Sequence, residues 1–285
     1  MTRSPGDFLA RMATASGVRA DAAEARRPAD LLAERIKRLP PPPALRLSPQ
    51  GFDLIAEVKR RSPSAGSLAD AALRIGNQAR SYLRGGAVAL SVLTEPEEFS
   101  GDLSHLKEVA AITGTVPAMR KDFLVSPYQL LEARAAGAGG VLLIAAMLGE
   151  RELREMLLAT HALGMFALVE VFDGADLERA VAAIRVTGPA VDAGRCRTLL
   201  GVNCRDLRTL KVDFGRFAEL APLLPRNIPT VAESGVESVG QAARVAGLGY
   251  SVALVGTALM RAADPGRLAG ELLEAGRASA FESRP

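Results

Sequence analysis

Glu57 and Lys59 place two opposite charges at the end of an otherwise apolar stretch, FDLIAEVK, at residues 52–59. The aliphatic and β-branched content of this stretch is typical of a buried strand. Side chains two positions apart in a strand point to the same face, so the carboxylate and the ammonium group lie side by side. Two interpretations are open: a solvated ion pair at a strand end, or groups that give and take protons in a reaction.

Polar residues end several other apolar runs of the chain in the same way. They are Lys121, Glu170, Asn203, Arg205, Glu233 and Ser234. Burying charge is costly unless it is paired, so a converging set of such residues is tolerated mainly where chemistry needs it. The two interpretations therefore depend on whether the fold brings these strand ends together.

Short apolar runs alternate with amphipathic helical segments from residue 52 onward. The expected strands cover residues 52–59, 87–94, 117–122, 139–147, 165–171, 199–204, 228–234 and 251–256. Helices are expected over residues 70–86, 102–112, 126–138, 150–164, 176–184 and 238–249, and several begin with Ser or Asp and end with Gly.

This alternation predicts an α/β protein whose parallel strands, apolar on both faces, close into a (β/α)8 TIM barrel. An open doubly wound sheet is the alternative. In a barrel the active site is built at the carboxyl ends of the strands, which is where the polar residues lie. The barrel therefore favours one catalytic mouth over separate surface ion pairs.

The composition restricts the kind of ligand. The chain has 285 residues, of which 48% are hydrophobic and 24% charged, enough for a substantial core. Its net charge is only +3, it has no Trp, and 4% of its residues are aromatic, so it lacks a stacking platform for nucleic acid. The longest apolar run, at residues 136–148, is too short to span a membrane. We expect a small anionic, phosphorylated ligand, whereas protein partners are left open by the sequence.

Neither a metal nor a cofactor is predicted. Cys196 and Cys204 belong to no CxxC motif or Cys/His cluster, and His105 and His161 fall within helical segments as helix-face residues. The N-terminus has no continuous apolar run of the kind found in signal peptides, so a reducing cytoplasm is the expected location.

Seven motifs, in order, resemble those of the indole-3-glycerol phosphate synthase family. They are IAEVKRRSPSAG, LSVLTEPEEFSGD, PAMRKDFLVSPYQLLEARAAGAGGVLLI, LVEV, GVNCRDLRTL, VAESGV and LVGTALM, within residues 52–266. The resemblance implies a (β/α)8 barrel and a decarboxylating lyase of tryptophan biosynthesis. Such an enzyme converts 1-(2-carboxyphenylamino)-1-deoxyribulose 5-phosphate into indole-3-glycerol phosphate, with loss of carbon dioxide and water.

The resemblance also implies roles for the strand-end residues. Lys121 corresponds to a lysine that donates a proton, and Lys59 to a second lysine that contacts the substrate carboxylate or acts as the acid in the dehydration. Glu170 matches the proposed base or proton shuttle. Which lysine serves which step stays open. The same cavity is expected to contain Glu57, Asn203 and Glu233 as further catalytic residues and Arg205 and Ser234 as substrate-binding residues.

A phosphate site is expected after the seventh and eighth strands. Gly235, Gly256 and Thr257 lie where barrels commonly bind phosphate through loop amides and a short helix, although glycines can also simply end strands. The family resemblance adds Ser62 to this site. Phe99 and Phe123 are candidates to stack on the substrate ring, or else belong to the core.

Residues 1–48 are expected to form a helical extension that caps the barrel, and residues 49–285 the catalytic barrel. LPPPP, at residues 39–43, cannot be helical and predicts an extended connector. The alternative functions are another phosphosugar barrel such as phosphoribosylanthranilate isomerase, which uses a Cys and an Asp, and a barrel that binds a sugar phosphate without turning it over.

Residues 186–198 depart from the family pattern, because they form a long connection between a helix and the next strand. Gly188, Pro189 and Gly194 predict an exposed, mobile loop on the face opposite the active site. Cys196 is then expected to be the more accessible thiol, whereas Cys204 is expected to pack away from the face that carries Asn203.

Overall fold

Eight parallel strands close into a barrel in this protein, whose computed structural model describes residues 8–62, 66–67, 75–207 and 211–282. In their order around the barrel the strands are β1 (Asp53–Val58), β12 (Val252–Val255), β11 (Thr230–Glu233), β10 (Thr198–Asn203), β7 (Phe166–Val171), β6 (Gly140–Ile144), β5 (Ala118–Lys121) and β4 (Ala89–Leu93). β4 pairs with β1, which closes the ring. The predicted (β/α)8 barrel is confirmed, and the open sheet is wrong.

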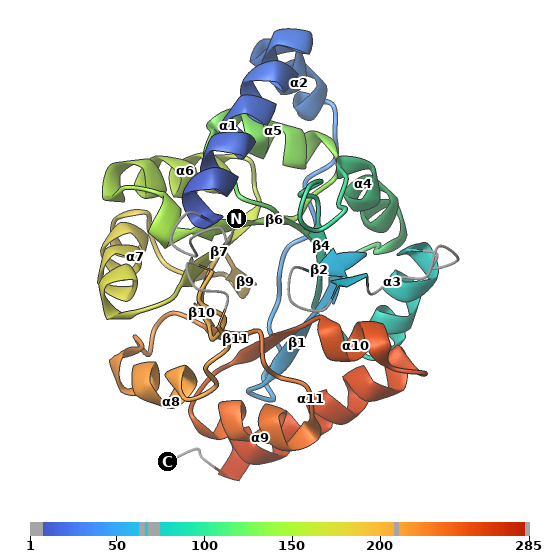
Figure 1. Cartoon of the computed structure of the whole chain (residues 1–285), viewed down its shortest axis with the longest axis vertical. Coiled ribbons are helices and arrows are strands. Elements are labelled where there is room, and N and C mark those ends of the chain that lie inside the picture. The colour runs from blue at the N-terminus through green and yellow to red at the C-terminus, as the bar shows by residue number, and fades with distance from the viewer. Residues whose placement is uncertain (1–7, 63–65, 68–74, 208–210, 283–285) are drawn as a thin grey trace, which may run out of the picture.

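Helices surround the barrel as an outer layer, as Figure 1 shows. Those that follow the strands in turn are α3 (Ile75–Arg84), α4 (Leu103–Ile112), α5 (Pro127–Ala135), α6 (Glu150–Ala162), α7 (Gly174–Val186), α8 (Arg216–Leu220), α9 (Val239–Gly247), α10 (Thr257–Arg261) and α11 (Pro265–Glu282). Short elements lie between the strands and helices of the barrel: β2 (Arg61–Ser62), β3 (Gly66–Ser67), η2 (Ala145–Met147), β8 (Val191–Asp192), β9 (Arg195–Cys196) and η3 (Ala221–Leu223). No helix among the described residues has the length and apolar character that a membrane crossing requires.

Side-chain caps explain where several helices begin. Asp102, Ser126 and Ser238 have extended backbone, and each accepts a hydrogen bond from a backbone N–H in the first turn of α4, α5 and α9. These N–H groups have no partner within the helix, so the caps satisfy them. Each cap is the first residue of the corresponding predicted helix.

Alternation along the strands divides the core into two layers. Leu54 and Ala56 of β1 pack outward against the helices, whereas Ile55 between them belongs to the cluster inside the barrel. Met119 of β5 and Leu168 of β7 also lie in the inner cluster. Because side chains of a strand alternate between its faces, these inner positions set which later residues of each strand face the barrel mouth.

The N-terminal segment contacts both ends of the barrel. It contains α1 (Phe8–Arg26) and α2 (Ala29–Lys37), and Figure 1 shows α1 running from beside α5 toward the middle of the barrel. The ring of Phe8 lies 6.0 Å from that of Phe123, just beyond the end of β5. Residues 40–44 are not helical, as the proline run predicts, and lead to Leu45 on the opposite face.

The connection between α7 and β10 agrees with its prediction in part. Residues 188, 189 and 191–195 are exposed, as predicted, but the connection also contains an antiparallel hairpin of β8 and β9, and the N–H of Cys196 donates to the carbonyl of Leu45 at 2.8 Å. Cys196 is 4% exposed and Cys204 is 0% exposed, so Cys196 is the more accessible thiol, as predicted, but it is buried in the inner cluster and does not lie in an exposed loop. Turn residues predicted the bend, but not the additional pairing with Leu45, which is far away in the sequence.

Cys204 is buried in the outer core, away from the barrel interior, as predicted. Burial raises the pKa of both thiols to about 12. Neither sulfur is therefore a reactive thiolate near neutral pH.

Leu45 and the hairpin should contribute stability rather than activity. Leu45→Ala removes a side chain that is 1% exposed and belongs to the inner cluster, so we expect it to lower the free energy of unfolding by about 2–4 kcal/mol and leave KM unchanged. Leu31→Ala, on α2 and 59% exposed, is the matched control and should change stability by less than about 0.5 kcal/mol. Denaturant unfolding measures the free energy of unfolding of both variants. An equal change in the two variants would contradict the role of Leu45 in the core at the end of the barrel opposite the active site.

Candidate active site

Strand alternation carries the predicted charged side chains into one mouth of the barrel. Glu57 and Lys59 lie two and four residues after Ile55, which faces the barrel interior, and Lys121 lies two residues after the interior Met119. The same period places Glu170, Asn203 and Glu233 on the inner side.

Two ion pairs join lysines and glutamates in this mouth. The Nζ of Lys59 lies 2.5 Å from Oε1 of Glu57, and the Nζ of Lys121 lies 3.7 Å from Oε2 of Glu170. The lysine side chains are 12% and 15% exposed, whereas the side chain of Glu170 is fully buried. Asn203 orients Glu170, because its Nδ2 donates to Oε2 of Glu170 at 3.0 Å. Each lysine thus has a carboxylate partner and still reaches the solvent-accessible cavity.

Burial and neighbouring charge compete in setting the protonation of these groups. Burial alone would lower the pKa of Lys121, but the carboxylates of Glu170, Glu233 and Glu57 outweigh it and raise that pKa above its usual value. Burial would raise the pKa of Glu57, yet Lys59 and Lys121 more than offset it and lower the pKa. Lys121 is consequently held as an ammonium group and Glu57 as a carboxylate.

Glu233 behaves differently from the other two glutamates. Burial, and then repulsion from Glu170, raise the pKa of Glu233 well above its usual value, although Lys121 acts in the opposite direction. Both carboxyl oxygens of Glu233 and Oε1 of Glu170 are buried, and no described group donates a hydrogen bond to them. A proton on Glu233 would remove the repulsion between the two carboxyl groups and the cost of a buried charge. We conclude that Glu233 keeps its proton beside Glu170.

Two glycines create the space that these carboxyl groups occupy. A Cβ on Gly201 would lie 2.0 Å from Oε1 of Glu233, and a Cβ on Gly256 would lie 2.2 Å from Oε1 of Glu57 and 2.9 Å from Nζ of Lys59. Gly201 was missed by the sequence analysis. Its signal is an isolated glycine within a strand, which often marks a close approach by another group.

The cavity above these pairs brings together most of the residues predicted for the site. Its walls include Glu57, Lys59, Phe99, Lys121, Phe123, Asn203, Arg205, Glu233, Ser234, Gly235, Gly256 and Thr257. Glu170 does not line the cavity but lies directly beneath it, in contact with Lys121. The side chain of Ser62 lies outside the described residues. No group of three His, Cys, Asp or Glu side chains among the described residues is placed to hold a metal ion.

The apolar part of the cavity wall was not predicted. Leu142 and Ile144 of β6, Leu207 and Leu254 contribute to it. Three of them, Leu142, Ile144 and Leu254, belong to expected strands. An apolar side chain in a strand does not indicate whether it faces another side chain or a ligand. Leu142 and Ile144, on the side of β6, make that part of the cavity suitable for an aromatic ring.

The polar end of the cavity lies across the barrel. Ser234 and Gly235 follow β11 with φ angles of 65° and 66°, and Thr257 begins α10 directly after Gly256. In the ring of eight strands, β11 and β12 lie four positions from β5 and β6, which is the opposite side. An elongated ligand with a ring at one end and an anion at the other therefore matches the cavity.

Comparison with known proteins agrees with the motifs. The sequence model of the family described as "Indole-3-glycerol phosphate synthase" matches residues 21–272. The chain belongs to the indole-3-glycerol phosphate synthase family. The indole-3-glycerol phosphate synthase of Parafrankia sp. (strain EAN1pec) is 44% identical over 265 residues, covering 91% of this chain and 93% of that protein. That of Micrococcus luteus is 45% identical over 277 residues, covering 94% and 97%.

Solved structures with lower identity share the barrel. The 3-hexulose-6-phosphate synthase from Salmonella typhimurium superposes with a TM-score of 0.61 at 14% identity, over 82% of this chain and 100% of that one. The thiamine phosphate pyrophosphorylase from Pyrococcus furiosus gives a TM-score of 0.55 at 18% identity, over 81% and 97%. At these identities the likeness concerns the fold alone, whereas membership of the indole-3-glycerol phosphate synthase family rests on the sequence.

Glu233→Gln should stabilise the protein, and more so at high pH. Wild-type Glu233 stays protonated in the folded state after it has ionised in the unfolded chain, so its contribution to stability is full below the unfolded pKa and is lost as pH rises toward the folded pKa. Glutamine has no proton to lose. We expect the variant's Tm to exceed that of the wild type by about 2 °C or more at pH 8, with a much smaller difference at pH 4.

Thermal unfolding followed by circular dichroism at both pH values measures the effect. Glu219→Gln, at an exposed position of α8, removes the same kind of carboxyl group and serves as the control. A Tm difference for Glu233→Gln that is equal at pH 4 and pH 8 would show that Glu233 is ionised in the folded protein.

Proposed function

We propose that this protein catalyses the ring closure, decarboxylation and dehydration of 1-(2-carboxyphenylamino)-1-deoxyribulose 5-phosphate to indole-3-glycerol phosphate. The observation that carries the proposal is the arrangement of Lys59 and Lys121, each paired with a carboxylate, around one cavity with an apolar side and a glycine-rich polar side. Family membership supports the same activity.

Lys121 is the proposed acid in the ring closure. The aromatic carbon that bears the carboxylate attacks the ketone carbon, a carbon–carbon bond forms, and the ketone oxygen must gain a proton as its charge develops. Nearby carboxylates keep Lys121 charged by raising its pKa. An ammonium group in this largely buried place can donate a hydrogen bond and then a proton to that oxygen.

Lys59 is proposed to hold the substrate carboxylate before it is lost. Its ammonium group lies at the cavity wall beside Glu57, which keeps it in place without filling its three donor positions. Decarboxylation breaks the bond between the ring and the carboxyl carbon, and the electron pair returns to the ring. With the carboxylate gone, Lys59 is free to act as the acid in the last step.

Glu170 is the proposed base of the dehydration. The hydroxyl formed in the ring closure leaves as water once an acid protonates it, and a base must take the remaining proton to complete the indole. Glu170 contacts Lys121 and Asn203, and it lies beside Glu233, whose pKa is raised by burial and by the charge of Glu170. Lys121 and Asn203 hold Glu170 in place, so its carboxylate can accept a proton and return it in each turnover.

The two ends of the cavity are assigned to the two ends of the substrate. Phe99 and Phe123, with the apolar wall beside them, are proposed to contact the ring. Amides near Gly235 and Gly256, together with Thr257, Ser234 and Ser62, are proposed to bind the phosphate, and Arg205 to contact the substrate. Glycine lets the backbone approach an anion closely. This orientation places the reacting carbons between the two lysines.

The alternative activities are less consistent with the site. Phosphoribosylanthranilate isomerase uses a Cys and an Asp, whereas Cys204 packs outside the barrel and the cavity contains a set of lysines and glutamates. A barrel that only binds sugar phosphates would not need buried charge of both signs.

The proposal also assigns a role to each part of the chain and a location to the protein. Residues 1–48 are a capping extension, residues 49–285 are the catalytic barrel, and the protein acts in the cytoplasm.

Turnover of the synthetic carboxyphenylamino deoxyribulose phosphate tests the function directly. Purified, chelator-treated protein should release a product with indole fluorescence without added metal or cofactor, because every proposed proton transfer uses a side chain of the chain itself. Absence of fluorescence from folded protein would reject the activity. Activity that is lost with the chelator and restored by a divalent ion would reject the metal-free mechanism.

Lys121→Met separates chemistry from binding. Methionine keeps much of the lysine's length but cannot donate a proton, so kcat should fall by about 10²-fold or more while binding of a substrate analogue is largely retained. Lys107→Met, on the exposed face of α4, removes an equal charge far from the cavity and should leave kcat unchanged. Steady-state kinetics on both variants decides; a near-normal kcat for Lys121→Met would move the acid to another residue.

A further inference from the structure

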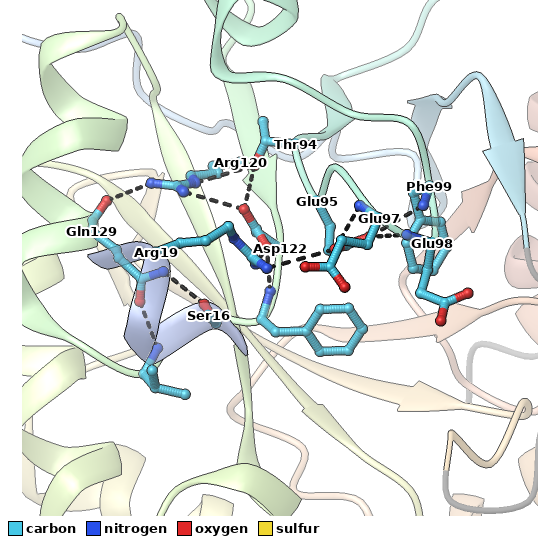
Figure 2. A network of polar contacts seen from close by, with 12 residues as sticks. Ser16, Arg19, Thr94, Glu95, Glu97, Glu98, Phe99, Arg120, Asp122 and Gln129 are labelled. Carbon is cyan, nitrogen blue, oxygen red and sulfur yellow. Dashed lines mark hydrogen bonds and ion pairs between the residues drawn. The ribbon is translucent and has the colours of Figure 1, made fainter. Parts of the chain in front are cut away.

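We propose that Arg19 of α1 positions the aromatic wall of the cavity, and so sets recognition of the substrate ring, by bridging two buried carboxylates. The inference rests on the proposed function. Arg19 does not line the cavity, so it is a positioning residue and not a substrate contact. Figure 2 shows the network in which it lies, between the N-terminal helix and the ends of two barrel strands.

The guanidinium of Arg19 lies between carboxylates from neighbouring strand ends. Its Nη1 is 3.7 Å from Oε1 of Glu95, just after β4, and its Nη2 is 3.4 Å from Oδ1 of Asp122, just after β5. The side chains of Glu95 and Asp122 are 0% and 2% exposed, whereas that of Arg19 is 28% exposed. A planar guanidinium can serve two carboxylates at once, which a lysine ammonium does less well.

Glu95 organises the backbone that carries Phe99. Its Oε1 accepts from the N–H of Glu97 at 2.9 Å, and its Oε2 accepts from the N–H groups of Glu98 and Phe99 at 2.7 and 3.1 Å. The carbonyl of Glu95 also accepts from the N–H of Gly101 at 2.7 Å. A single buried carboxylate thus shapes the turn that presents Phe99 to the cavity.

Asp122 does the same for Phe123. Its Oδ1 accepts from the N–H of Phe123 at 2.9 Å, and its Oδ2 accepts from the hydroxyl of Thr94 at 2.7 Å and from Arg120 at 3.1 Å. Phe99 and Phe123 lie 6.3 Å apart between ring centroids, and both line the cavity. Arg19 therefore links the two backbone segments whose separation determines the spacing of these rings.

Removing Arg19 should loosen this wall without detaching α1. Asp122 would keep Arg120 as a cationic partner, whereas Glu95 would keep three backbone N–H donors and no cation among the interactions described for it. A buried carboxylate without a counter-charge is costly, so the turn is expected to shift toward water.

Other contacts should still hold α1 in place. The amide of Gln129 donates to the hydroxyl of Ser16 at 2.8 Å, the hydroxyl of Tyr128 donates to the carbonyl of Arg27 at 2.9 Å, and Phe8 packs on Phe123. A change confined to the Glu95 turn would alter ring binding, while Lys121, Glu170 and the phosphate side across the barrel keep their geometry.

The test compares Arg19→Met with Arg26→Met. Methionine retains the apolar stem of arginine and removes its charge, and Arg26 is an exposed residue of the same helix. Arg19→Met should raise the KM for the substrate about tenfold and change kcat by less than about threefold, because a displaced wall weakens binding more than proton transfer. Arg26→Met should match the wild type. Arg19→Lys should recover part of the loss, since lysine can serve only one of the two carboxylates well.

Inhibition constants separate ring recognition from a general loss of structure. The Ki of the product indole-3-glycerol phosphate should rise with the KM, whereas the Ki of glycerol 3-phosphate, which has no ring, should stay at the wild-type value. Adding Glu95→Gln to Arg19→Met should cause little further loss, because the unpaired charge has been removed. Should Arg19→Met fail to fold, the same measurements on Arg19→Lys decide.

Three outcomes would overturn the inference. They are unchanged kinetics in a folded Arg19→Met variant, an equal rise of both Ki values, and a fall in kcat at constant KM. An inactive wild-type protein would instead reject the proposed function, so the two failures can be told apart.

Discussion

Two lysines and three glutamates interact closely in and beneath the cavity, and the balance between their burial and their charges decides which of them are ionised. Lys59 and Lys121 supply two positive charges, whereas Glu57, Glu170 and Glu233 could supply three negative ones. Buried charges of one sign repel strongly because little water screens them. The raised pKa of Glu233 reduces the negative charge, since a carboxyl group that keeps its proton no longer repels Glu170 and Glu57. The neighbouring carboxylates also keep Lys121 charged by raising its pKa.

The barrel provides what this cluster needs, because it converts a local property of strands into a shared space. Side chains alternate along each strand, and closure brings the inner side chains of all eight strands together. Glycines at positions 201 and 256 leave room for carboxyl groups of neighbouring strands. The apolar wall near β5 and β6 lies on the opposite side of the barrel from the glycine-rich loops after β11 and β12. The substrate is therefore expected to bind in one orientation.

The N-terminal segment joins the two ends of this barrel. Arg19 and Phe8 contact the carboxyl-terminal mouth, while Leu45 pairs with the hairpin at the opposite face. The proline-rich connector runs between them, and Arg134 donates a hydrogen bond to the carbonyl of Pro40 along the way. One segment thus contacts both the end of the barrel opposite the active site and the loops around the cavity. Substitutions at its Leu45 end are expected to change stability, whereas substitutions at its Arg19 end are expected to change ligand recognition.

Much of the fold and of the candidate site could be predicted from the sequence, because both depend on local patterns. Apolar runs with β-branched residues marked the eight strands, Ser and Asp caps marked several helix starts, and polar residues at strand ends marked Lys121, Glu170 and Glu233. Motif order identified the family. These signals lie within a few residues of one another, so no knowledge of distant contacts was required.

Only the tertiary structure decided which groups meet. Arg19 and Asp122 are 103 residues apart in sequence, and nothing near either one indicates the other. Cys196 pairs with Leu45, which is far away in the sequence, and the raised pKa of Glu233 depends on burial and on Glu170 from another strand. A sequence determines which side chains are present and how each strand orients them. The distances between them, and hence their pairing, burial and charge, arise only when the barrel closes.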